Sequence, residues 1–475
     1  MNYKELFIGT DLYINTSDQK KTERIYLDSA ASNLALRSSQ EISQEYLNYY
    51  ANAHTKVHAA AKFTTELIVW AENTIKNFLG ADDTYSVVFL GNGVTFPLNR
   101  LALGLSKLRP EKDTVMISSM EHHSNDLPHR VNHEKVMYIS GFDEKGDYIG
   151  FDLAEIEQQL ESSNGKVNYV AITGASNVSG EISPYHEIAK LAHQYDAYII
   201  VDGAQLVAHA SVSLVNKEDP LSSVDFFVFS GHKIYTPGSP GVLIGKKEIL
   251  AQMEPIFYGG GMVSSVTLKD FTVAEHLSDK EHAGTLNIPG IISLGCTINF
   301  MQHVEMEKVY AKEQHLINYL YAELSQIPEV ILYPNANITN KVGVICLNLQ
   351  NIPHELTSLI LNDYFGIAVR NECFCSHPFV KDCLVEELWD IEDESAVNLY
   401  RGMVRVSLGL YTTEKDLEFF VQSIKKIIGN IDFYRMQYEL IDKTNYKHKD
   451  FDNDLKDYFD IEKKIKNYYE KSYSS

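Results

Sequence analysis

From Tyr26 to about Gly295 the chain alternates short β-rich runs with amphipathic stretches, and this alternation constrains its fold more than any other feature. Strands separated by helices predict an α/β fold with a mostly parallel sheet and helices on both faces. Ligands of such sheets bind beyond the carboxyl ends of the strands, so polar residues that follow a strand are the first site candidates. The predicted strands are Tyr85–Leu90, Thr114–Ser118, Lys135–Ser140, Asn168–Thr173, Ala197–Asp202, Val224–Ser230 and Gly241–Gly245, and the clearest helices are Glu66–Phe78, Leu153–Leu160 and Tyr185–Gln194.

A different order begins near residue 298 and predicts a smaller α+β domain. Its expected elements are a long helix over Asn299–Leu324, strands at Val330–Leu332, Gly343–Leu349, Ile367–Arg370 and Val404–Leu408, a helix near Glu355–Tyr364 and a helix from Thr413 to Gly429. We therefore divide the chain into an N-terminal arm (1–25), a large ligand-binding domain (26–297), a small α+β domain (298–430) and a C-terminal extension (431–475). The extension has no strand pattern, and its apolar spacing predicts a helix: Phe451, Leu455, Tyr458, Phe459, Ile461 and Ile465.

The charge balance argues against two classes of partner. Asp and Glu number 64 against 42 Lys and Arg, a net charge of −22. Nucleic acids and anionic membranes repel a field of that sign. No apolar run reaches the roughly 18 residues that a membrane span requires, and the N-terminus lacks a signal-peptide pattern, so we expect a soluble cytoplasmic protein. Five cysteines in 475 residues do not make a disulfide scaffold.

Two segments that follow predicted strands carry groups suited to a carbonyl cofactor. Lys233 ends the segment SGHK, where a desolvated amine can form a Schiff base and where Ser230 and His232 can donate to a phosphate. A solvated surface lysine is the alternative. Asp202 ends an apolar strand and can pair with the protonated ring nitrogen of pyridoxal 5′-phosphate (PLP), with Gln205 near the ring oxygen. The alternative for Asp202 is a helix N-cap.

Two further turns offer a phosphate cradle and an imidazole. The segment GNGVT at 91–95 leads from a strand into a helix, so backbone N–H groups near Gly93 and Thr95 can bind a phosphate. It completes neither a dinucleotide fingerprint nor a P-loop. His122 and His123 follow the strand ending at Ser118, and one of the two can stack on a cofactor or carry a proton. No carboxylate or thiol lies at metal-ligand spacing beside them.

Thiols crowd into a loop after the strand predicted to end at Arg370. A loop cysteine near cations can have a lowered pKa and act as a nucleophile, and Cys373 and Cys375 are the candidates. A metal site is one alternative; its ligands would be Cys373, Cys375, His377 and Cys383 at an unusual spacing, and we predict no metal. Inert cysteines are the other alternative.

Together, these segments resemble the class V aminotransferase family of fold-type I PLP enzymes, and within it group II cysteine desulfurases and selenocysteine lyases. The resemblance covers about Tyr26–Lys425 and implies a PLP-binding large domain with a smaller C-terminal domain. The matching segments are YLDSAAS (26–32), MEHHSN (120–125), SNVSGEISP (176–184), VDGAQ (201–205), DFFVFSGHKIY (225–235), AGTLN (283–287), GIAVRNECFCSHP (366–378) and VRVSLGLYTTEKDL (404–417).

The resemblance also implies roles for individual residues. The catalytic set would be the Schiff-base Lys233, the stacking His122, the carboxylate clamp Arg405, a second arginine Arg370 and the nucleophile Cys375. The cofactor set would be Asp202 at the ring nitrogen, Gln205 at the ring oxygen, Gly93, Thr95, Ser230 and His232 at the phosphate, Asn177 near the substrate carboxylate and Thr285 at the phosphate of a second subunit. Thr285 therefore implies a homodimer.

The implied reaction is sulfur removal from L-cysteine or a related amino acid. Alanine leaves, a persulfide forms on Cys375, and a sulfur-acceptor protein is the implied partner. The chain departs from the family pattern RxGxHCA, with Glu372 for Gly, Cys373 at a polar position and Ser376 for Ala, and Lys280-Glu281-His282 replaces the usual RFE. Glu372 places a negative charge near the thiol. Cys373 is a second thiol that would face the opposite side in an extended segment, so Cys375 is favoured.

Two alternatives stay open. One is a PLP enzyme of this family that acts on another amino acid without a catalytic thiol, as a transaminase, epimerase or C–S/Se lyase, and the departures around Cys375 motivate it. The other is a non-enzymatic scaffold, which the unmatched extension motivates and the complete set of Lys233, Asp202 and Arg405 opposes.

Overall fold

A seven-stranded sheet forms the centre of the larger part of the computed structural model, which describes residues 3–53, 55, 57–275, 277–335, 338–384, 399–442, 444–452 and 454–473. All strands run parallel except β10, which is antiparallel to both neighbours. The expected mostly parallel sheet is thus confirmed. In sheet order the strands are β4 (Tyr85–Leu90), β10 (Gly241–Lys246), β9 (Phe226–Ser230), β8 (Tyr198–Asp202), β7 (Val167–Thr173), β5 (Thr114–Ser118) and β6 (Lys135–Ile139).

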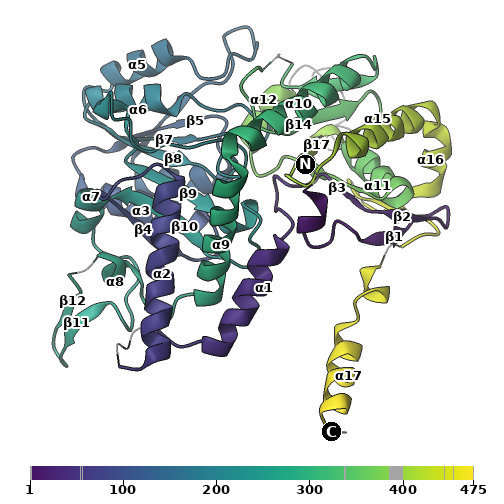
Figure 1. Cartoon of the computed structure of the whole chain (residues 1–475). Coiled ribbons are helices and arrows are strands. Elements are labelled where there is room, and N and C mark those ends of the chain that lie inside the picture. The colour runs from purple at the N-terminus through teal and green to yellow at the C-terminus, as the bar shows by residue number, and fades with distance from the viewer. Residues whose placement is uncertain are drawn as a thin grey trace.

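Helices cover both faces of this sheet, as the buried strands require (Figure 1). Successive strand residues point to opposite faces, so Val87 and Phe89 pack into one core and Val88 and Leu90 into the other. The first core also holds α1 (Arg37–Tyr46), α2 (Ala59–Phe78), α5 (Leu153–Ser162), α6 (Tyr185–Gln194) and α9 (Ile288–Val304). The second holds α3 (Thr95–Leu108) and α7 (Lys247–Gln252). Shorter elements complete this part: η2 (Leu47–Tyr49), η3 (His123–Asn125), α4 (Leu127–Asn132), η4 (Pro220–Ser222), η5 (Gly231–Lys233), β11 (Val263–Val266), β12 (Phe271–Val273) and α8 (Leu277–Glu281).

The second part is a four-stranded sheet with helices and its own core. Its strands, in order, are β13 (Val330–Tyr333), β14 (Val344–Leu349), β17 (Met403–Ser407) and β16 (Arg370–Glu372). The helices are α10 (Met306–Ser325), α11 (His354–Phe365), α12 (His377–Cys383) and α15 (Glu414–Gly429), and Thr413 begins α15 with a capping box. The capping box explains why the start of α15 could be recognised in the sequence.

Two element predictions in this part are wrong. The single helix expected over Asn299–Leu324 is two helices, α9 and α10, separated by Glu305 with a left-handed φ of 68°. Such a break usually carries a glycine, so a glutamate there gave no signal. The strand expected over Ile367–Arg370 is divided into β15 (Ile367–Ala368) and β16, which join different sheets. The proposed boundary at residue 297 falls inside α9, and the division of the chain into domains stays a prediction.

Residues 3–25 pack against both parts of the molecule. β1 (Tyr13–Asn15) and β2 (Lys21–Glu23) form a hairpin, and β3 (Ile25–Tyr26) pairs in parallel with β15. Phe7 is fully buried, with ring centroids 4.9 Å from Tyr235 and 5.1 Å from Tyr411. A few apolar anchors in a polar segment are enough to fix it, which composition alone did not reveal.

The extension contains a hairpin as well as helices. After α16 (Ile431–Gln437), strands β18 (Tyr438–Leu440) and β19 (Tyr446–His448) pair, and the Tyr438 hydroxyl donates to Asp363 over 2.9 Å. η6 (Leu455–Asp457) and α17 (Ile461–Tyr473) follow, and α17 projects away from the body (Figure 1). The helix predicted from Phe451 onwards is therefore a short 3-10 turn at Leu455–Asp457 and an α-helix that begins only at Ile461. Within the described residues, no helix combines the length and apolar character that crossing a membrane requires.

Candidate active site

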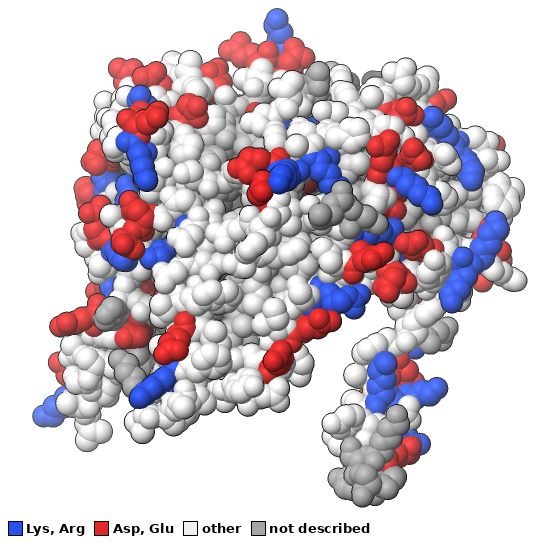
Figure 2. All heavy atoms as spheres, in the orientation of Figure 1, with Lys and Arg blue, Asp and Glu red and all other residues white. Residues whose placement is uncertain are grey.

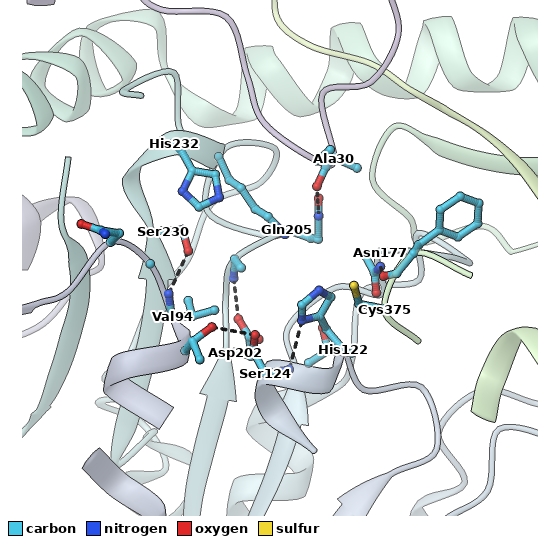
Figure 3. Close-up of a pocket in the computed structure, with 18 of the residues that line it drawn as sticks. Ala30, Val94, His122, Ser124, Asn177, Asp202, Gln205, Ser230, His232 and Cys375 are labelled. Carbon is cyan, nitrogen blue, oxygen red and sulfur yellow. Dashed lines mark hydrogen bonds between the residues drawn. The ribbon is translucent and has the colours of Figure 1, made fainter. Parts of the chain in front are cut away.

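The predicted site residues converge on one cavity of about 380 Å³ beyond the carboxyl ends of β5, β7, β8 and β9 (Figure 3). This is the edge at which ligands of parallel sheets bind. Twelve of the thirteen predicted site residues line it: Gly93, Thr95, His122, Asn177, Asp202, Gln205, Ser230, His232, Lys233, Arg370, Cys375 and Arg405. The exception, Thr285, is in contact with Asn52 outside the cavity. The resemblance assigned Thr285 to a second subunit, so its role stays a prediction.

Lys233 and Asp202 form the floor of the cavity. β9 ends at Ser230 and η5 carries Lys233 into the cavity, where burial lowers the pKa of its amine to about 8 against the opposing attraction of Asp202. Asn33 fixes the backbone here by donating to the Lys233 carbonyl over 2.7 Å. Asp202 is buried at the end of β8 and accepts from the Ala204 N–H over 3.0 Å. Burial raises its pKa, and the Ala204 N–H and Lys233 act in the opposite direction.

One end of the cavity is a cradle of donors at the start of α3. The Ser230 hydroxyl accepts from the Val94 N–H over 3.0 Å, and the hydroxyls of Thr95 and Ser124 lie 2.8 Å apart. A Cβ on Gly93 would lie 3.0 Å from Ser230 Oγ and 3.3 Å from the His232 ring. A Cβ here would be in tight contact with both groups, so the glycine keeps this space open. Hydroxyls and a helix N-terminus around an open space favour an anion such as a phosphate.

His122 lines the cavity (Figure 3), and its imidazole is neutral. Its Nδ1 accepts from the Ser124 N–H over 3.1 Å, so Nε2 carries the hydrogen. Burial first, and then Lys233, lower its pKa to about 3. Behind it, Glu121 is buried and accepts from Ser118, Asn125 and the Thr173 N–H. This network fixes the turn that presents His122.

Two arginines face the other end of the cavity from paired strands. Arg370 on β16 lies opposite Arg405 on β17. The buried Arg405 guanidinium donates through Nη1 to the Asn177 carbonyl over 3.1 Å, and its Nη2 lies 3.5 Å from Asp28 Oδ1. Arg405 Nε is buried and has no acceptor among the residues that the structure describes. A buried donor with no partner marks the place for a ligand carboxylate.

The Cys375 loop reaches into the cavity from the second part of the molecule. It is not extended: Glu372, Phe374 and Cys375 have left-handed φ values of 84°, 51° and 55°. The expectation that Cys373 and Cys375 face opposite sides of an extended segment is therefore wrong. Cys375 is exposed, whereas Cys373 is half-buried and its thiol donates to the Arg401 carbonyl over 3.5 Å.

Three other cysteines have raised thiol pKa values, which disfavour the reactive thiolate. Burial raises the pKa of the Cys373 thiol, with Glu372 as the second cause, and burial likewise raises the pKa of Cys346 and of Cys383. Across the described part of the chain, His, Cys, Asp and Glu side chains form no group of three that could hold a metal ion.

Sequence reasoning missed several residues of the site. Ser124, Phe374, Ala30 and Ala31 line the cavity, and Asp28 contacts Arg405. Asp28, Ala30 and Ala31 belong to the matching segment YLDSAAS and Ser124 to MEHHSN, so the motifs held a signal that single-residue reasoning did not use. Phe374 also belongs to a matching segment, GIAVRNECFCSHP, but its place at the cavity depends on the left-handed loop, which the motif does not reveal.

Comparisons with known proteins agree with one another. The family model "Aminotransferase class-V" matches residues 25–420. A probable cysteine desulfurase of Halalkalibacterium halodurans is 31% identical over 427 residues, covering 89% of this chain and 96% of that protein. A cysteine desulfurase of Escherichia coli is 31% identical over 436 residues, covering 90% and 99%.

Solved structures agree with the sequence comparisons. The apo structure of a cysteine desulfurase from Thermococcus onnurineus superposes with a TM-score of 0.75 at 26% identity, covering 86% of this chain and 95% of that one. The cysteine desulfurase CsdA of E. coli superposes with a TM-score of 0.71 at 22% identity over 90% and 98%, which bears on the fold alone.

Proposed function

The chain belongs to the class V aminotransferase family, and from this premise we propose that it is a PLP-dependent cysteine desulfurase. It removes sulfur from L-cysteine, releases L-alanine and carries the sulfur as a persulfide on Cys375. One observation carries the proposal: Cys375, an exposed thiol, lines the same cavity as Lys233, Asp202 and Arg405. Both relatives named above are described as cysteine desulfurases.

The residues present fit PLP. The Gly93 cradle with Ser230, Thr95 and His232 suits its phosphate, and a Cβ at Gly93 would fill the space that the phosphate needs. Asp202 lies in the floor as the partner for a protonated ring nitrogen, and Lys233 would hold the cofactor. When bound, PLP supplies an electron sink for negative charge at the substrate Cα.

The remaining chemistry belongs to side chains of this chain. Arg405 binds the substrate carboxylate, because it lines the cavity and its guanidinium keeps a donor, Nε, without an acceptor among the described residues. Lys233 moves the proton at the substrate Cα, since an amine with a pKa of about 8 is a competent base near neutral pH. His122 stays neutral and presents Nε2–H to the reacting centre.

Cys375 performs the sulfur transfer. Its thiolate attacks the substrate sulfur, so a bond forms between the two sulfur atoms while the substrate Cβ–S bond breaks. The electron pair of that bond stays with Cβ, which takes up a proton to become the alanine methyl group. Cys375 then carries the sulfur as a persulfide, and its exposure allows a sulfur-acceptor protein to reach it.

We further propose a homodimer and a reducing compartment. Thr285 lies outside the cavity of its own chain and would serve the cavity of a second copy. All five cysteines are free thiols in the structure, as in proteins of the cytosol, where thiols stay reduced.

The test is a single-turnover reaction of the purified, PLP-loaded protein with L-cysteine. We expect stoichiometric alanine and a persulfide that mass spectrometry places on Cys375. Cys375→Ala should abolish both while the absorbance of the bound cofactor is kept, and Cys373→Ala, the matched control in the same loop, should keep both. A loaded protein that forms no alanine from L-cysteine would sink the proposal and favour a family enzyme acting on another amino acid.

A further inference from the structure

The loop that carries Cys375 holds a conformation that its own sequence disfavours. Glu372, Phe374 and Cys375 all have left-handed φ values, and none of them is glycine. Each such residue costs on the order of 1–2 kcal/mol. The loop therefore needs contacts outside itself that hold it in place.

Asn177 supplies such contacts on both sides of Cys375. Its Nδ2 donates to the Phe374 carbonyl over 2.9 Å, and its Oδ1 accepts from the Ser376 hydroxyl over 3.0 Å. Ser376 is completely buried and Asn177 is 5% exposed, so water does not compete for these bonds. The His123 N–H also donates to the Cys375 carbonyl over 2.7 Å. The large part of the molecule thus holds the residue before Cys375, the residue after it and its own carbonyl.

The same asparagine is tied to the arginine that we propose as the carboxylate clamp. Arg405 Nη1 donates to the Asn177 carbonyl over 3.1 Å. The Arg405 guanidinium also lies 4.7 Å from the centre of the Phe374 ring. Arg405, Asn177 and Phe374 therefore contact one another pairwise. Ser376, on the other side of Cys375, bonds to the same Asn177.

We propose that Ser376, acting through Asn177, is a positioning residue that holds Cys375 over the cavity and keeps it in register with Arg405. Ser376 lines no part of the cavity and does not touch the reacting atoms. The inference rests on the proposed function only in taking Cys375 as the nucleophile. The family pattern RxGxHCA has alanine at this position, and alanine has no hydroxyl to donate, so the Ser376–Asn177 bond is a departure from that pattern.

The experiment compares Ser376→Ala with Ser423→Ala in the full-length, PLP-loaded protein. Ser423 is equally buried, and its hydroxyl donates to the Phe419 carbonyl in α15, away from the cavity. Hydrogen exchange is followed at two bonded amides, Ser376 N–H to the Cys373 carbonyl and His123 N–H to the Cys375 carbonyl. Loss of one buried hydrogen bond should speed exchange at both by roughly five- to tenfold in Ser376→Ala.

Kinetics separate positioning from general stability. Ser376→Ala should lower kcat for alanine formation by roughly tenfold and leave KM for L-cysteine within about twofold, because the Arg405 clamp stays intact. Ser376→Thr, which keeps the hydroxyl, should restore kcat. In an Asn177→Ala background, Ser376→Ala should change the exchange rates no further, since its partner is already gone.

Two outcomes would overturn the proposal. One is exchange at the two amides that stays within twofold of the Ser423→Ala control. The other is faster exchange across the whole molecule, which would make the hydroxyl a support of the fold rather than of the loop. If the wild type forms no alanine from L-cysteine, the proposed function fails, and the exchange measurements still decide whether Ser376 holds the loop.

Discussion

The floor of the cavity and the Cys375 loop meet at one site, yet they are built by different means. Of the floor residues, Asp202 ends the buried strand β8 and Lys233 lies in η5, which directly follows the buried strand β9, so the sheet fixes where both lie. The loop is attached to the smaller part of the molecule, has three left-handed residues and is held by side-chain bonds to Asn177. Changes in the floor should therefore abolish the chemistry, whereas changes in the loop at residues other than the nucleophile Cys375 should only adjust its rate.

This difference matches the two halves of the proposed reaction. Activation at the substrate Cα needs a rigid, desolvated base and counter-charge, which a buried sheet edge provides. Sulfur transfer needs a nucleophile that first reaches the substrate and then an acceptor protein. An exposed loop held by a few specific bonds can serve both, because each bond contributes only about 1 kcal/mol net.

The largest effect is expected from the floor. Lys233→Ala should lower alanine formation by at least about a thousandfold, since it removes both the cofactor attachment and the base. With both proteins free of cofactor, the midpoint of thermal unfolding should not fall, because the substitution removes a desolvated amine. Alanine release and the absorbance of the cofactor are measured together. Turnover that persisted in this variant would contradict the role of the floor.

Arg405→Lys should have the next largest effect, because Arg405 contacts both Asn177 and the loop residue Phe374. A lysine keeps the charge but loses the fork that reaches Asn177 and a carboxylate together. We expect KM for L-cysteine to rise by roughly ten- to a hundredfold, the equivalent of one charged hydrogen bond. Steady-state kinetics on L-cysteine provide the measurement. Arg370→Lys is the matched control on the paired strand and should raise KM less, since Arg370 is more exposed.

The electrostatics of the floor can be tested without the cofactor. Burial lowers the pKa of Lys233 to about 8 and Asp202 acts to raise it, so the reactive neutral amine predominates above about pH 8. Acylation of Lys233 in the cofactor-free protein, followed by peptide mass spectrometry, should rise about tenfold per pH unit below 8 and then level off. Asp202→Asn removes the attraction for the ammonium and should move this midpoint to lower pH. A rise that continues towards pH 10.5 would show that Lys233 is an ordinary solvated lysine.

The same contrast explains what the sequence could predict. Asp202 and Ser230 end strands with buried, continuous apolar patterns, and His122 follows such a strand, so their meeting at one edge follows from the parallel sheet. The bonds of Asn177 to the loop depend on left-handed backbone at Phe374 and Cys375. Such backbone is normally marked by glycine or asparagine, and neither occurs at these two positions, so the loop geometry had no local signal.

Other missed features have the same cause. The break between α9 and α10 lies at Glu305, again a left-handed position without glycine. The β18–β19 hairpin in the extension is stabilised by long-range contacts such as Tyr438 with Asp363, which no local pattern encodes. Tertiary contacts therefore determine the structure in the regions where the local sequence pattern predicts none.

The smallest effect is expected at Glu372, where the loop departs from the family pattern of glycine. Its φ of 84° favours glycine, so Glu372→Gly should raise the free energy of unfolding by about 0.5–1 kcal/mol after the added entropy of the unfolded chain is offset. Glu372→Ala is the matched control: it removes the charge but keeps the Cβ, and should give no such gain. Both variants should lower the pKa of Cys373, because Glu372 is one cause of its elevation. Urea unfolding measures the change in the free energy of unfolding, and thiol titration measures the change in the pKa of Cys373. Equal stability of the Gly and Ala variants would mean that the backbone is not strained at this residue.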